Sequence, residues 1–329
     1  MVRTVGLLMA GGRGTRLYPA SRSHRPKQFC SFGGDRSLLR RAADRTSDLD
    51  SVYAVTRSRY ADRVREIVPE ATVLTEPTPK DTGPALVYAA HEIADREDDP
   101  VLLCLPSDHV VGDGFEADAR TALRTAAQTG GLVTMGIEPT RPATGYGYIR
   151  PGDFREGYAP VQAFHEKPDR DTAEQYVEKG YRWNAGIFAW RPEALLRAAR
   201  ETPLDPLVAA LESGDPQEGF DVAPSISIDH GVLTRAENVF VVSAAFPWDD
   251  LGSWDALGRL LDGENAVLGE ATTMDASGNV IATDEKHVSV VGVDDVVVAA
   301  YDDRVLVVPT DQAQRVRDLV SVLEETSSL

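Results

Sequence analysis

Cysteine is scarce in this chain of 329 residues, which has only Cys30 and Cys104. An isolated pair without Cys-x-x-Cys spacing excludes a disulfide framework and a cysteine zinc site. Long apolar runs are also absent, and the N-terminal run covers only residues 5–10. That run is too short for the core of a signal peptide and far too short for a membrane span. The sequence therefore predicts a soluble, cytoplasmic protein.

Positive charge is the second scarcity. Asp and Glu number 52 against 34 Lys and Arg, so the formal net charge is −18. An acidic chain is a poor partner for nucleic acid, because phosphate backbones are bound through basic surfaces. We therefore expect no nucleic acid and no membrane among its partners, whereas a single nucleotide needs only a few local cations.

Lysine is scarcer still, because it accounts for five of the 34 basic residues and arginine for the other 29. An acid-rich, lysine-poor composition favours the salt-rich cytoplasm of a halophilic archaeon, where charge is screened within a few ångströms. The alternative is an ordinary acidic protein from a GC-rich genome, which has the same composition.

Apolar runs alternate with amphipathic segments through the first half of the chain. Buried strands are predicted at residues 4–9, 51–56, 71–75, 101–105 and 132–137. Helices are predicted at residues 37–46, 58–68, 83–96 and 115–129. Such alternation favours a parallel sheet covered on both faces by helices, whose ligands bind beyond the carboxyl ends of the strands.

Two further helices are expected in the second half of the large domain, at residues 171–179 and 253–261. Beyond residue 263 the pattern changes to short strands, at residues 278–283, 288–291, 296–300 and 305–308. A final helix is expected at residues 312–325. We therefore predict a large α/β domain over residues 1–263 and a small β-rich domain with a terminal helix over residues 264–329.

A glycine-rich turn follows the first predicted strand. Gly11, Gly12 and Gly14 lie in it, and backbone amides in such a turn approach phosphate oxygens closely. No Gly-Lys-Ser/Thr follows, which excludes a P-loop, and the third glycine of a dinucleotide fingerprint is replaced by Leu17. Basic residues crowd the same stretch, at Arg13, Arg16, Arg22, Arg25 and Lys27. The stretch is interpreted as a polyphosphate site, and the alternative is a solvated basic loop.

The segment Gly11-Gly12-Arg13-Gly14-Thr15-Arg16-Leu17, followed by Pro26-Lys27-Gln28-Phe29, resembles the signature of sugar-phosphate nucleotidyltransferases. Its Pro-Lys-Gln ending is similar to that of the mannose-1-phosphate guanylyltransferases. The resemblance implies an α/β fold with a Rossmann-like, mixed and mostly parallel sheet flanked by helices. It also implies that residues 1–263 are the catalytic domain and residues 264–329 a β-helix-like appendage.

Two carboxylates are the metal ligands that the resemblance implies. Asp108 directly follows a predicted strand, and Asp250 precedes Gly252-Ser253-Trp254. Carboxylate oxygens suit Mg²⁺, which takes few protein ligands when phosphates supply the rest. The neighbouring Asp249 is either a supporting acid or a surface charge.

The remaining site residues are assigned by the same resemblance. The sugar phosphate is expected at Gly147, Glu166, Lys167 and Asn184. The nucleotide is expected at Leu8, Ala10, Gly11, Gly12, Gly14, Thr15, Arg16, Lys27, Asp81, Thr82 and Ala85. Arg16, Lys27 and Lys167 are the expected catalytic cations. Asp81 stands where guanylyltransferases commonly have Asn, and its carboxylate offers an acceptor to guanine N1–H and N2–H.

The implied reaction converts mannose 1-phosphate and GTP into GDP-mannose and pyrophosphate, with Mg²⁺ as cofactor and no covalent enzyme intermediate. An alternative on the same fold is another pair, such as glucose 1-phosphate with UTP or dTTP. A nicotinamide oxidoreductase and a catalytically dead regulatory homologue are the rival classes. The six histidines lack zinc-ligand spacing, and no Gly-x-Ser-x-Gly elbow points to a serine hydrolase. A homodimer is a further hypothesis.

Overall fold

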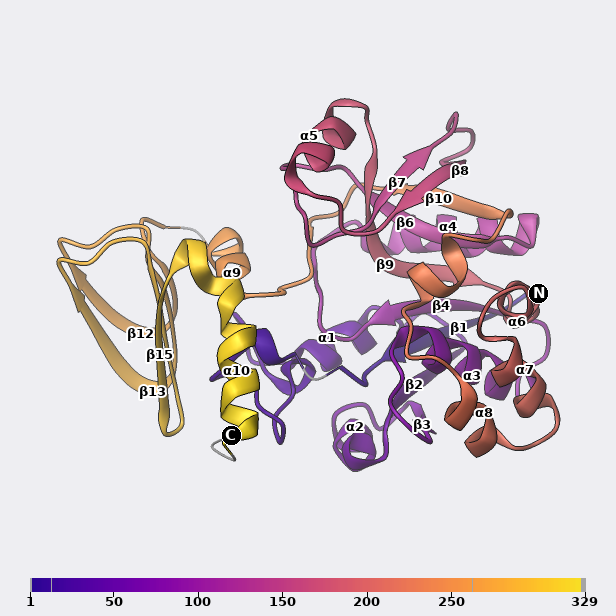
Figure 1. Cartoon of the computed structure of the whole chain (residues 1–329), viewed down its shortest axis with the longest axis horizontal. Coiled ribbons are helices and arrows are strands. Elements are labelled where there is room, and N and C mark those ends of the chain that lie inside the picture. Colours follow the sequence, from indigo (N-terminus) through magenta and orange to yellow (C-terminus); the bar gives the residue numbers. More distant parts are fainter. Residues whose placement is uncertain (1, 13, 262, 327–329) are drawn as a thin grey trace. The chain divides into compact units, whose positions relative to one another are not determined.

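The computed structural model describes residues 2–12, 14–261 and 263–326 (Figure 1), so Arg13 of the basic stretch lies outside the described residues. The chain divides into two compact units that alternate along the sequence. The first unit comprises Met1–Gly11, Ala42–Ser107 and Val111–Trp248, and the second comprises Gly12–Arg41, Asp108–Val110 and Asp249–Leu329. The domain boundary expected after residue 263 stays a prediction.

A nine-stranded sheet is the framework of the first unit, in the order β3-β2-β1-β4-β9-β6-β10-β8-β7. Its strands are β1 (Arg3–Met9), β2 (Ser51–Arg57), β3 (Thr72–Glu76), β4 (Pro100–Pro106), β6 (Leu132–Ile137), β7 (Tyr148–Pro151), β8 (Tyr158–His165), β9 (Arg182–Trp190) and β10 (Val239–Ala244). Of these strands, β8 and β9 run against the direction that the other strands share. The expected mixed, mostly parallel sheet is confirmed.

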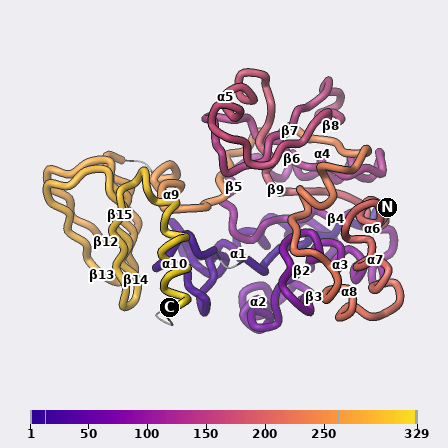
Figure 2. Tube along the Cα trace, viewed as in Figure 1, coloured from indigo at the N-terminus to yellow at the C-terminus, as the bar shows by residue number. Residues whose placement is uncertain are grey.

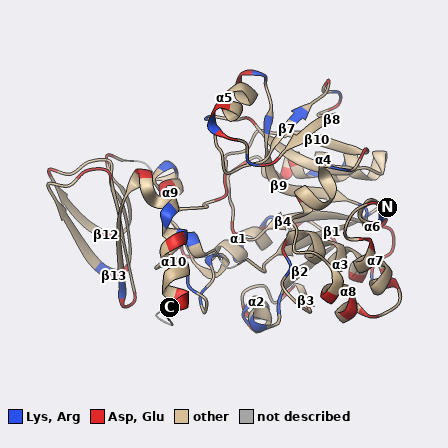
Figure 3. Cartoon of the chain, viewed as in Figure 1, with Lys and Arg blue, Asp and Glu red and all other residues tan. Residues whose placement is uncertain are grey.

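Helices connect and cover these strands (Figure 2). They are α2 (Ala61–Ile67), α3 (Thr82–Ala94), α4 (Phe115–Thr129), α5 (Arg170–Glu178), α6 (Pro192–Arg200), α7 (Asp205–Glu212) and α8 (Pro216–Val222). Acidic residues lie on α7 and α8, as the red segments of the ribbon in Figure 3 show. In the ranges that the structure describes, no helix combines the length and apolarity needed to cross a bilayer.

The carboxyl ends of β1 and β4 meet at one edge of the sheet. The two strands pair in parallel, so Met9 lies beside Pro106. Ser107 fixes this edge, because its Oγ donates to the Met9 carbonyl oxygen at 2.7 Å and its backbone N–H donates to the same oxygen at 3.2 Å. The glycine turn and the segment carrying Asp108 therefore both leave the sheet from this edge.

The second unit is built on a four-stranded sheet, coloured orange to yellow in Figure 2. Its strands are β12 (Ala266–Met274), β13 (Val280–Val291), β14 (Val296–Tyr301) and β15 (Arg304–Pro309). The first three pair in parallel, and β15 is antiparallel to β14. Helical segments accompany them: η1 (Thr15–Leu17), η2 (Lys27–Phe29), α9 (Trp254–Leu260), η5 (Thr310–Arg315) and α10 (Val316–Glu325). The β-rich C-terminal part is confirmed.

Three short elements lie where the chain passes from one unit to the other. They are α1 (Leu38–Asp44), β5 (Val110–Val111) and β11 (Trp248–Asp249).

Two strands of the second unit differ from the expectation. The predicted strands at 278–283 and 288–291 are one continuous strand, β13, and β12 was not predicted. β13 exposes polar side chains at alternate positions in its second half, at Glu285, His287 and Ser289, which hides the continuity of the strand. Most of β12 is exposed, including Glu270, Thr272 and Thr273, so it lacks the apolar run that signals a buried strand. Gly269, with φ of 99°, also interrupts the regular pairing of β12 with β13.

Trp254 holds the core of the second unit together. Its ring is fully buried, and its Nε1 donates to the Tyr18 carbonyl oxygen at 2.8 Å. The ring also stacks on Tyr301 of β14 and meets Phe32 edge-on, with centroid distances of 6.1 and 6.3 Å. Residues of the N-terminal loops, α9 and the C-terminal sheet thus share one apolar core.

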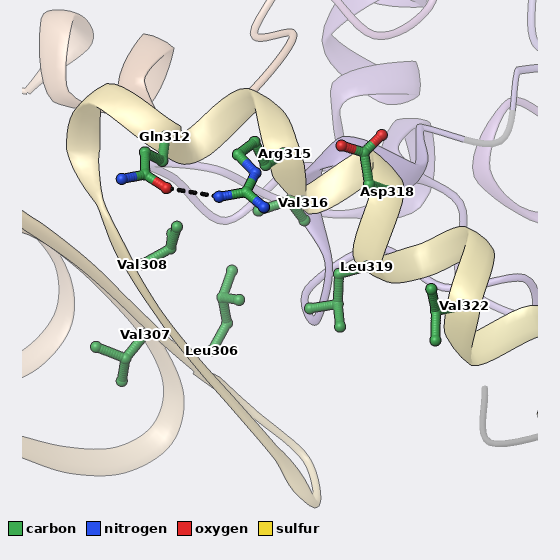
Figure 4. A pocket seen from close by; sticks show the side chains of 9 residues that line it. All are labelled: Leu306, Val307, Val308, Gln312, Arg315, Val316, Asp318, Leu319 and Val322. Atoms are coloured by element: carbon green, nitrogen blue, oxygen red, sulfur yellow. Dashed lines mark hydrogen bonds between the residues drawn. The ribbon is translucent and has the colours of Figure 1, made fainter.

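An apolar groove of about 360 Å³ lies between β15 and α10 (Figure 4). Leu306 lines it from the strand, and Leu319 and Val322 line it from the helix. β15 is an edge strand of its sheet, and its Val305 and Val307 are each 65% exposed.

Candidate active site

The glycine turn is kept open by the absence of side chains. Gly14 has φ of 61°, and a Cβ there would lie 2.3 Å from Lys27 Cβ, so only glycine fits. Gly12 is exposed, and a Cβ there would meet nothing within 4 Å. Buried Gln28 donates from Nε2 to the Gly12 carbonyl oxygen at 3.0 Å. The Pro-Lys-Gln segment therefore holds the turn on one side, and no described residue fills the space at Gly12.

Lys27 brings two predicted site residues together in the second unit. Its side chain is 5% exposed, and Nζ lies 3.0 Å from Asp108 Oδ2. The same ammonium donates to the carbonyl oxygen of Asp250. A buried ammonium needs such partners, because an isolated charge in the interior is costly.

Asp108 is ionised in this setting. Burial acts to raise the pKa of its carboxyl, but the charges of Lys27 and His109 outweigh that effect and hold the pKa below its usual value. His109 Nε2 lies 3.9 Å from Asp108 Oδ1, and burial lowers the pKa of this imidazole. Asp108 is therefore a carboxylate at neutral pH, and its role as a metal ligand stays a prediction.

The oxygen donors near Lys27 fit a hard divalent cation. Within residues 2–12, 14–261 and 263–326, no three carboxylate, thiol or imidazole side chains gather as a metal cluster. Two carboxylates are nonetheless sufficient for Mg²⁺, which retains water molecules and accepts phosphate oxygens as further ligands. Asp108 contacts Lys27 through its carboxylate, whereas Asp250 contacts Lys27 through its backbone carbonyl oxygen. The Asp250 carboxylate accepts the Gly252 N–H at Oδ1, at 3.0 Å. That these two side chains hold one cation stays a prediction.

Asp249 shapes the turn that carries Asp250. It is 5% exposed, so the alternative that it is a surface charge is wrong. Its Oδ1 accepts the Leu251 N–H at 2.8 Å, and its Oδ2 accepts from Arg259 at 3.0 Å. Leu251 has φ of 43°, a left-handed conformation that needs such support.

The described arginines of the basic stretch are of two kinds, those paired with acidic side chains and one that is exposed. Arg22 Nη1 lies 2.9 Å from Asp303, and Arg25 Nη2 lies 3.5 Å from Asp302. These two arginines join the N-terminal loop to the β14–β15 turn, because acidic partners from the distant C-terminal strands reach them. Arg16 is exposed, so it is the arginine of the described stretch that is open to a ligand.

Glu166 and Lys167 follow β8 in the first unit. Lys167 Nζ lies 2.9 Å from Glu166 Oε2, and the lysine side chain is 65% exposed with φ of 42° at its backbone. Gly147 contributes space, since a Cβ there would lie 2.8 Å from Glu166 Oε1. The predicted glutamate, lysine and glycine thus lie together.

Asn184 on β9 adds a buried amide to the first unit. Thr134 Oγ1 donates to its Oδ1 at 2.7 Å, and its Nδ2 donates to Asp229 Oδ1 at 2.6 Å. Asp229 starts a short π-helix, η4 (Asp229–Leu233). No motif of the sequence pointed to Asp229, because its contact with Asn184 joins positions 45 residues apart.

The loop after β3 is rigidly held. Asp81 Oδ1 accepts the Thr82 N–H at 2.7 Å, so this carboxylate caps α3. Thr82 Oγ1 accepts from Ile228 N at 2.9 Å, and Lys80 donates from Nζ to the carbonyl oxygens of Asp221 and Ala223. Asp81 is exposed, and its role toward a base stays a prediction.

Glu76, at the end of β3, is a site candidate that the sequence analysis missed. It is 5% exposed, and burial, with a smaller contribution from Asp81, raises the pKa of its carboxyl to about 7 against the opposing effect of Arg57. A Cβ on Gly11 would lie 3.1 Å from Glu76 Oε1, so this acid lies directly beside the glycine turn. The feature of the sequence that could have identified Glu76 is its position immediately before the predicted base loop.

The other expected nucleotide contacts lie on the same elements. Leu8 and Ala10 are fully buried, and Ala10 donates its backbone N–H to Val55 at 2.9 Å. Ala85 is half-buried on α3, and Thr15 begins η1. Their contacts with a nucleotide stay predictions.

Family models and individual relatives agree on what this chain resembles. The nucleotidyl transferase model matches residues 5–265, and the model of the MannoseP isomerase/GMP-like beta-helix domain matches residues 269–323. A mannose-1-phosphate guanylyltransferase of Sinorhizobium fredii is 37% identical, over 98% of this chain and 68% of its own length. The chain belongs to the mannose-1-phosphate guanylyltransferase family. It is therefore an enzyme of nucleotidyl transfer, with a nucleotide and a sugar phosphate as its substrates.

Two further relatives extend the similarity. The xanthan biosynthesis protein XanB of Xanthomonas campestris pv. campestris is 37% identical, over 97% of this chain and 73% of its own length. A crystal structure described as a mannose-1-phosphate geranyltransferase from Thermus thermophilus matches with a TM-score of 0.92. It is 37% identical and covers 98% of this chain and 100% of that one. The similarity therefore includes both the large sheet and the C-terminal strands.

Replacement of Asp249 by alanine tests the role of its contacts. Loss of the carboxylate leaves Arg259 and the Leu251 N–H without a principal partner, so the free energy of unfolding should fall by about 2–4 kcal/mol. Urea denaturation followed by circular dichroism measures the change. The matched control is Asp62→Ala, which removes an exposed pair with Arg65 and should cost less than about 0.5 kcal/mol. Equal stability losses in the two variants would contradict the assignment.

Proposed function

We propose that this chain transfers the guanylyl group of GTP to α-D-mannose 1-phosphate, which gives GDP-mannose and pyrophosphate. The observation that carries the proposal is the cluster of Lys27, Asp108 and Asp250 behind an open glycine turn. Both substrates are polyanions, so the transfer depends on charge neutralisation and alignment rather than on an enzyme nucleophile.

The triphosphate is the proposed ligand of the glycine turn. Backbone amides of Gly12 and Gly14 donate to its oxygens, while Lys27 and exposed Arg16 neutralise its charge. Lysine suits this position, because an ammonium on a flexible stem acts as a compact point charge. The same amides and cations hold the pyrophosphate as it leaves. They therefore stabilise the negative charge that develops on it during the transfer.

Mg²⁺ is the proposed cofactor, with Asp108 and Asp250 as its protein ligands. When bound, it neutralises negative charge on the reacting phosphates. The chain's own contribution is positional, because Asp249 and Arg259 fix the turn from which Asp250 projects.

The sugar phosphate is the proposed ligand of the Glu166 cluster. Lys167 aligns its phosphate as the attacking group, which is consistent with the exposure of this ammonium. Glu166 and Asn184 bind ring hydroxyls, and the missing side chain at Gly147 leaves room for the ring.

Substrate profiling tests the proposed function. Pyrophosphate release is measured with GTP, UTP, dTTP and ATP, each with mannose 1-phosphate and with glucose 1-phosphate. We expect the highest kcat/KM for GTP with mannose 1-phosphate. A preference for glucose 1-phosphate with UTP or dTTP would establish the alternative pair on the same fold.

The two predicted catalytic lysines provide a second test. Lys27→Ala and Lys167→Ala should each lower kcat/KM by about two to three orders of magnitude, because each removes a cation that faces a reacting phosphate. Lys179→Ala, at the exposed residue that follows α5, is the control and should keep full activity. Circular dichroism confirms folding of all three variants. Near-normal turnover in either site variant would refute that lysine's role.

We propose that Glu76 recognises the guanine base. Its carboxylate offers acceptors to guanine N1–H and N2–H, donors that uracil and thymine lack as a pair. Glu76 suits this role better than Asp81, whose Oδ1 already accepts the Thr82 N–H. Because burial raises the pKa of Glu76 to about 7 and the ionised form is the one that accepts both hydrogens, GTP binding should release a proton.

The pH dependence of GTP binding tests this assignment. Raising the pH from 6 to 8 ionises Glu76 and should lower the KM for GTP by about tenfold. Glu76→Gln should remove that component and lower the preference for GTP over UTP and dTTP. Asp81→Asn should leave both properties unchanged. The reverse pattern, with base selection lost in the Asp81 variant alone, would assign the base to Asp81.

A homodimer through the edge strand β15 is also proposed. Exposed Val305 and Val307 on an unpaired strand edge favour pairing with a second copy. Light scattering should give twice the chain mass of 35.7 kDa, and Val307→Lys should shift the protein to the monomer. A monomer mass for the unchanged chain at tens of micromolar would rule the dimer out.

A further inference from the structure

One of the two Nδ2 hydrogens of Asn184 makes no hydrogen bond to the described residues. Its Oδ1 accepts hydrogen bonds from Thr134 and from the Gly186 N–H, and one of its two Nδ2 hydrogens is donated to Asp229. Among the residues that the structure describes, the other Nδ2 hydrogen has no acceptor, and no other residue donates to Asp229 Oδ2. A ligand that both donates and accepts, such as a hydroxyl group, satisfies the two together.

The backbone just before Asp229 is also held, by hydrogen bonds to the loop that starts α3. Gly83 N donates to the Ile226 carbonyl oxygen at 3.0 Å, and Ile228 N donates to Thr82 Oγ1 at 2.9 Å. The approach is so close that a Cβ on Gly83 would lie 2.6 Å from the same carbonyl oxygen. Asp229 is therefore held both by the sheet, through Asn184, and by the loop that starts α3. Such a preorganised carboxyl binds a ligand at little cost in side-chain entropy.

The charge around Asp229 suits a neutral hydroxyl rather than a cation. Burial and the nearby charge of Glu166 raise the pKa of Asp229 to about 7, while the hydrogen bond from Asn184 and the charge of Lys167 act to lower it. At neutral pH the group is thus partly protonated, and it donates as well as accepts hydrogen bonds. Glu166, Asn184 and Asp229 present three polar side chains in one neighbourhood.

We propose that Asp229 is a specificity-determining residue that binds one ring hydroxyl of the sugar phosphate, with the free Nδ2 hydrogen of Asn184 as its partner. The inference rests on the proposed function, because it adds a ligand group to the sugar site. A hydroxyl in such a pocket contributes strongly to selectivity, since an analogue that lacks it leaves buried polar groups unpaired.

A set of monodeoxy analogues tests the assignment. Binding of mannose 1-phosphate and its 2-, 3-, 4- and 6-deoxy analogues is measured by calorimetry, and kcat and KM are measured with GTP. In the unchanged protein, loss of the hydroxyl that Asp229 binds should weaken binding by about tenfold or more. In Asp229→Ala the difference between that analogue and mannose 1-phosphate should fall well below this factor, because only Asn184 remains as a partner of the hydroxyl. The KM for GTP should change by less than about twofold.

Control variants separate binding from a structural role. Asp229→Asn keeps the size of the side chain, so it provides a folded protein if the alanine variant fails to fold, and it should also lose most of the dependence on that hydroxyl. Asp221→Asn, an exposed acid on α8, should behave like the unchanged protein. The proposal is wrong if each deoxy analogue binds more weakly than mannose 1-phosphate by the same factor in the Asp229 variants as in the unchanged protein. In that case Asp229 does not contact the sugar.

Failure of the proposed function is distinguishable from failure of this inference. If mannose 1-phosphate with GTP is not the preferred pair, the substrate profile shows it directly. The deoxy series is then repeated with the hexose 1-phosphate that the enzyme does use. Coupling between Asp229 and one hydroxyl of that sugar would support the inference, and equal behaviour of all analogues would overturn it.

Discussion

The ion pair between Lys27 and Asp108 joins two distant segments of the second unit around one buried charge. A lysine that is 5% exposed must keep its charge satisfied, and it does so with one carboxylate and one carbonyl oxygen from two segments far apart in the sequence. The stem of Lys27 fills the space beside Gly14, which explains why the turn tolerates only glycine there. One buried side chain therefore fixes the shape of the turn, pairs with the Asp108 carboxylate and holds the backbone that carries Asp250.

In the first unit a neutral amide takes the place that a buried ammonium has in the second. Its polar cluster is organised by the amide of Asn184, and the backbone that carries Asp229 is hydrogen-bonded to the loop that starts α3. The segments proposed to meet the base and the sugar are thus parts of one hydrogen-bonded framework. A shift of one segment is resisted by the other, which is a physical basis for selecting base and sugar together.

Much of this arrangement was predictable from the sequence, and the reasons are physical. Apolar runs identified the strands of the parallel half within one residue, because the central residues of β1, β2, β4 and β6 are buried on both faces. The edge strand β3 is only partly buried and was identified equally well. The family resemblance implied site roles for Lys27, Asp108 and Asp250. In the structure Lys27 contacts the side chain of Asp108 and the backbone carbonyl oxygen of Asp250, and the roles of the three residues stay predictions. Glu76 and Asp229 were missed because their environment is made by distant segments. The acidic partners of Arg22 and Arg25 were missed for the same reason, as was β12 with its exposed polar side chains.

The hydrogen bond between Trp254 and Tyr18 spans 236 positions of the chain, and Tyr301 stacks on the same indole ring. During synthesis the N-terminal loop therefore emerges long before the residues that pack against it exist. Contacts of such sequence separation form late, after the entropy of closing a long loop has been overcome. We therefore expect the loop that carries the glycine turn to reach its final shape only after the last strands of the chain have been made, which puts the turn proposed to bind phosphate among the late products of folding.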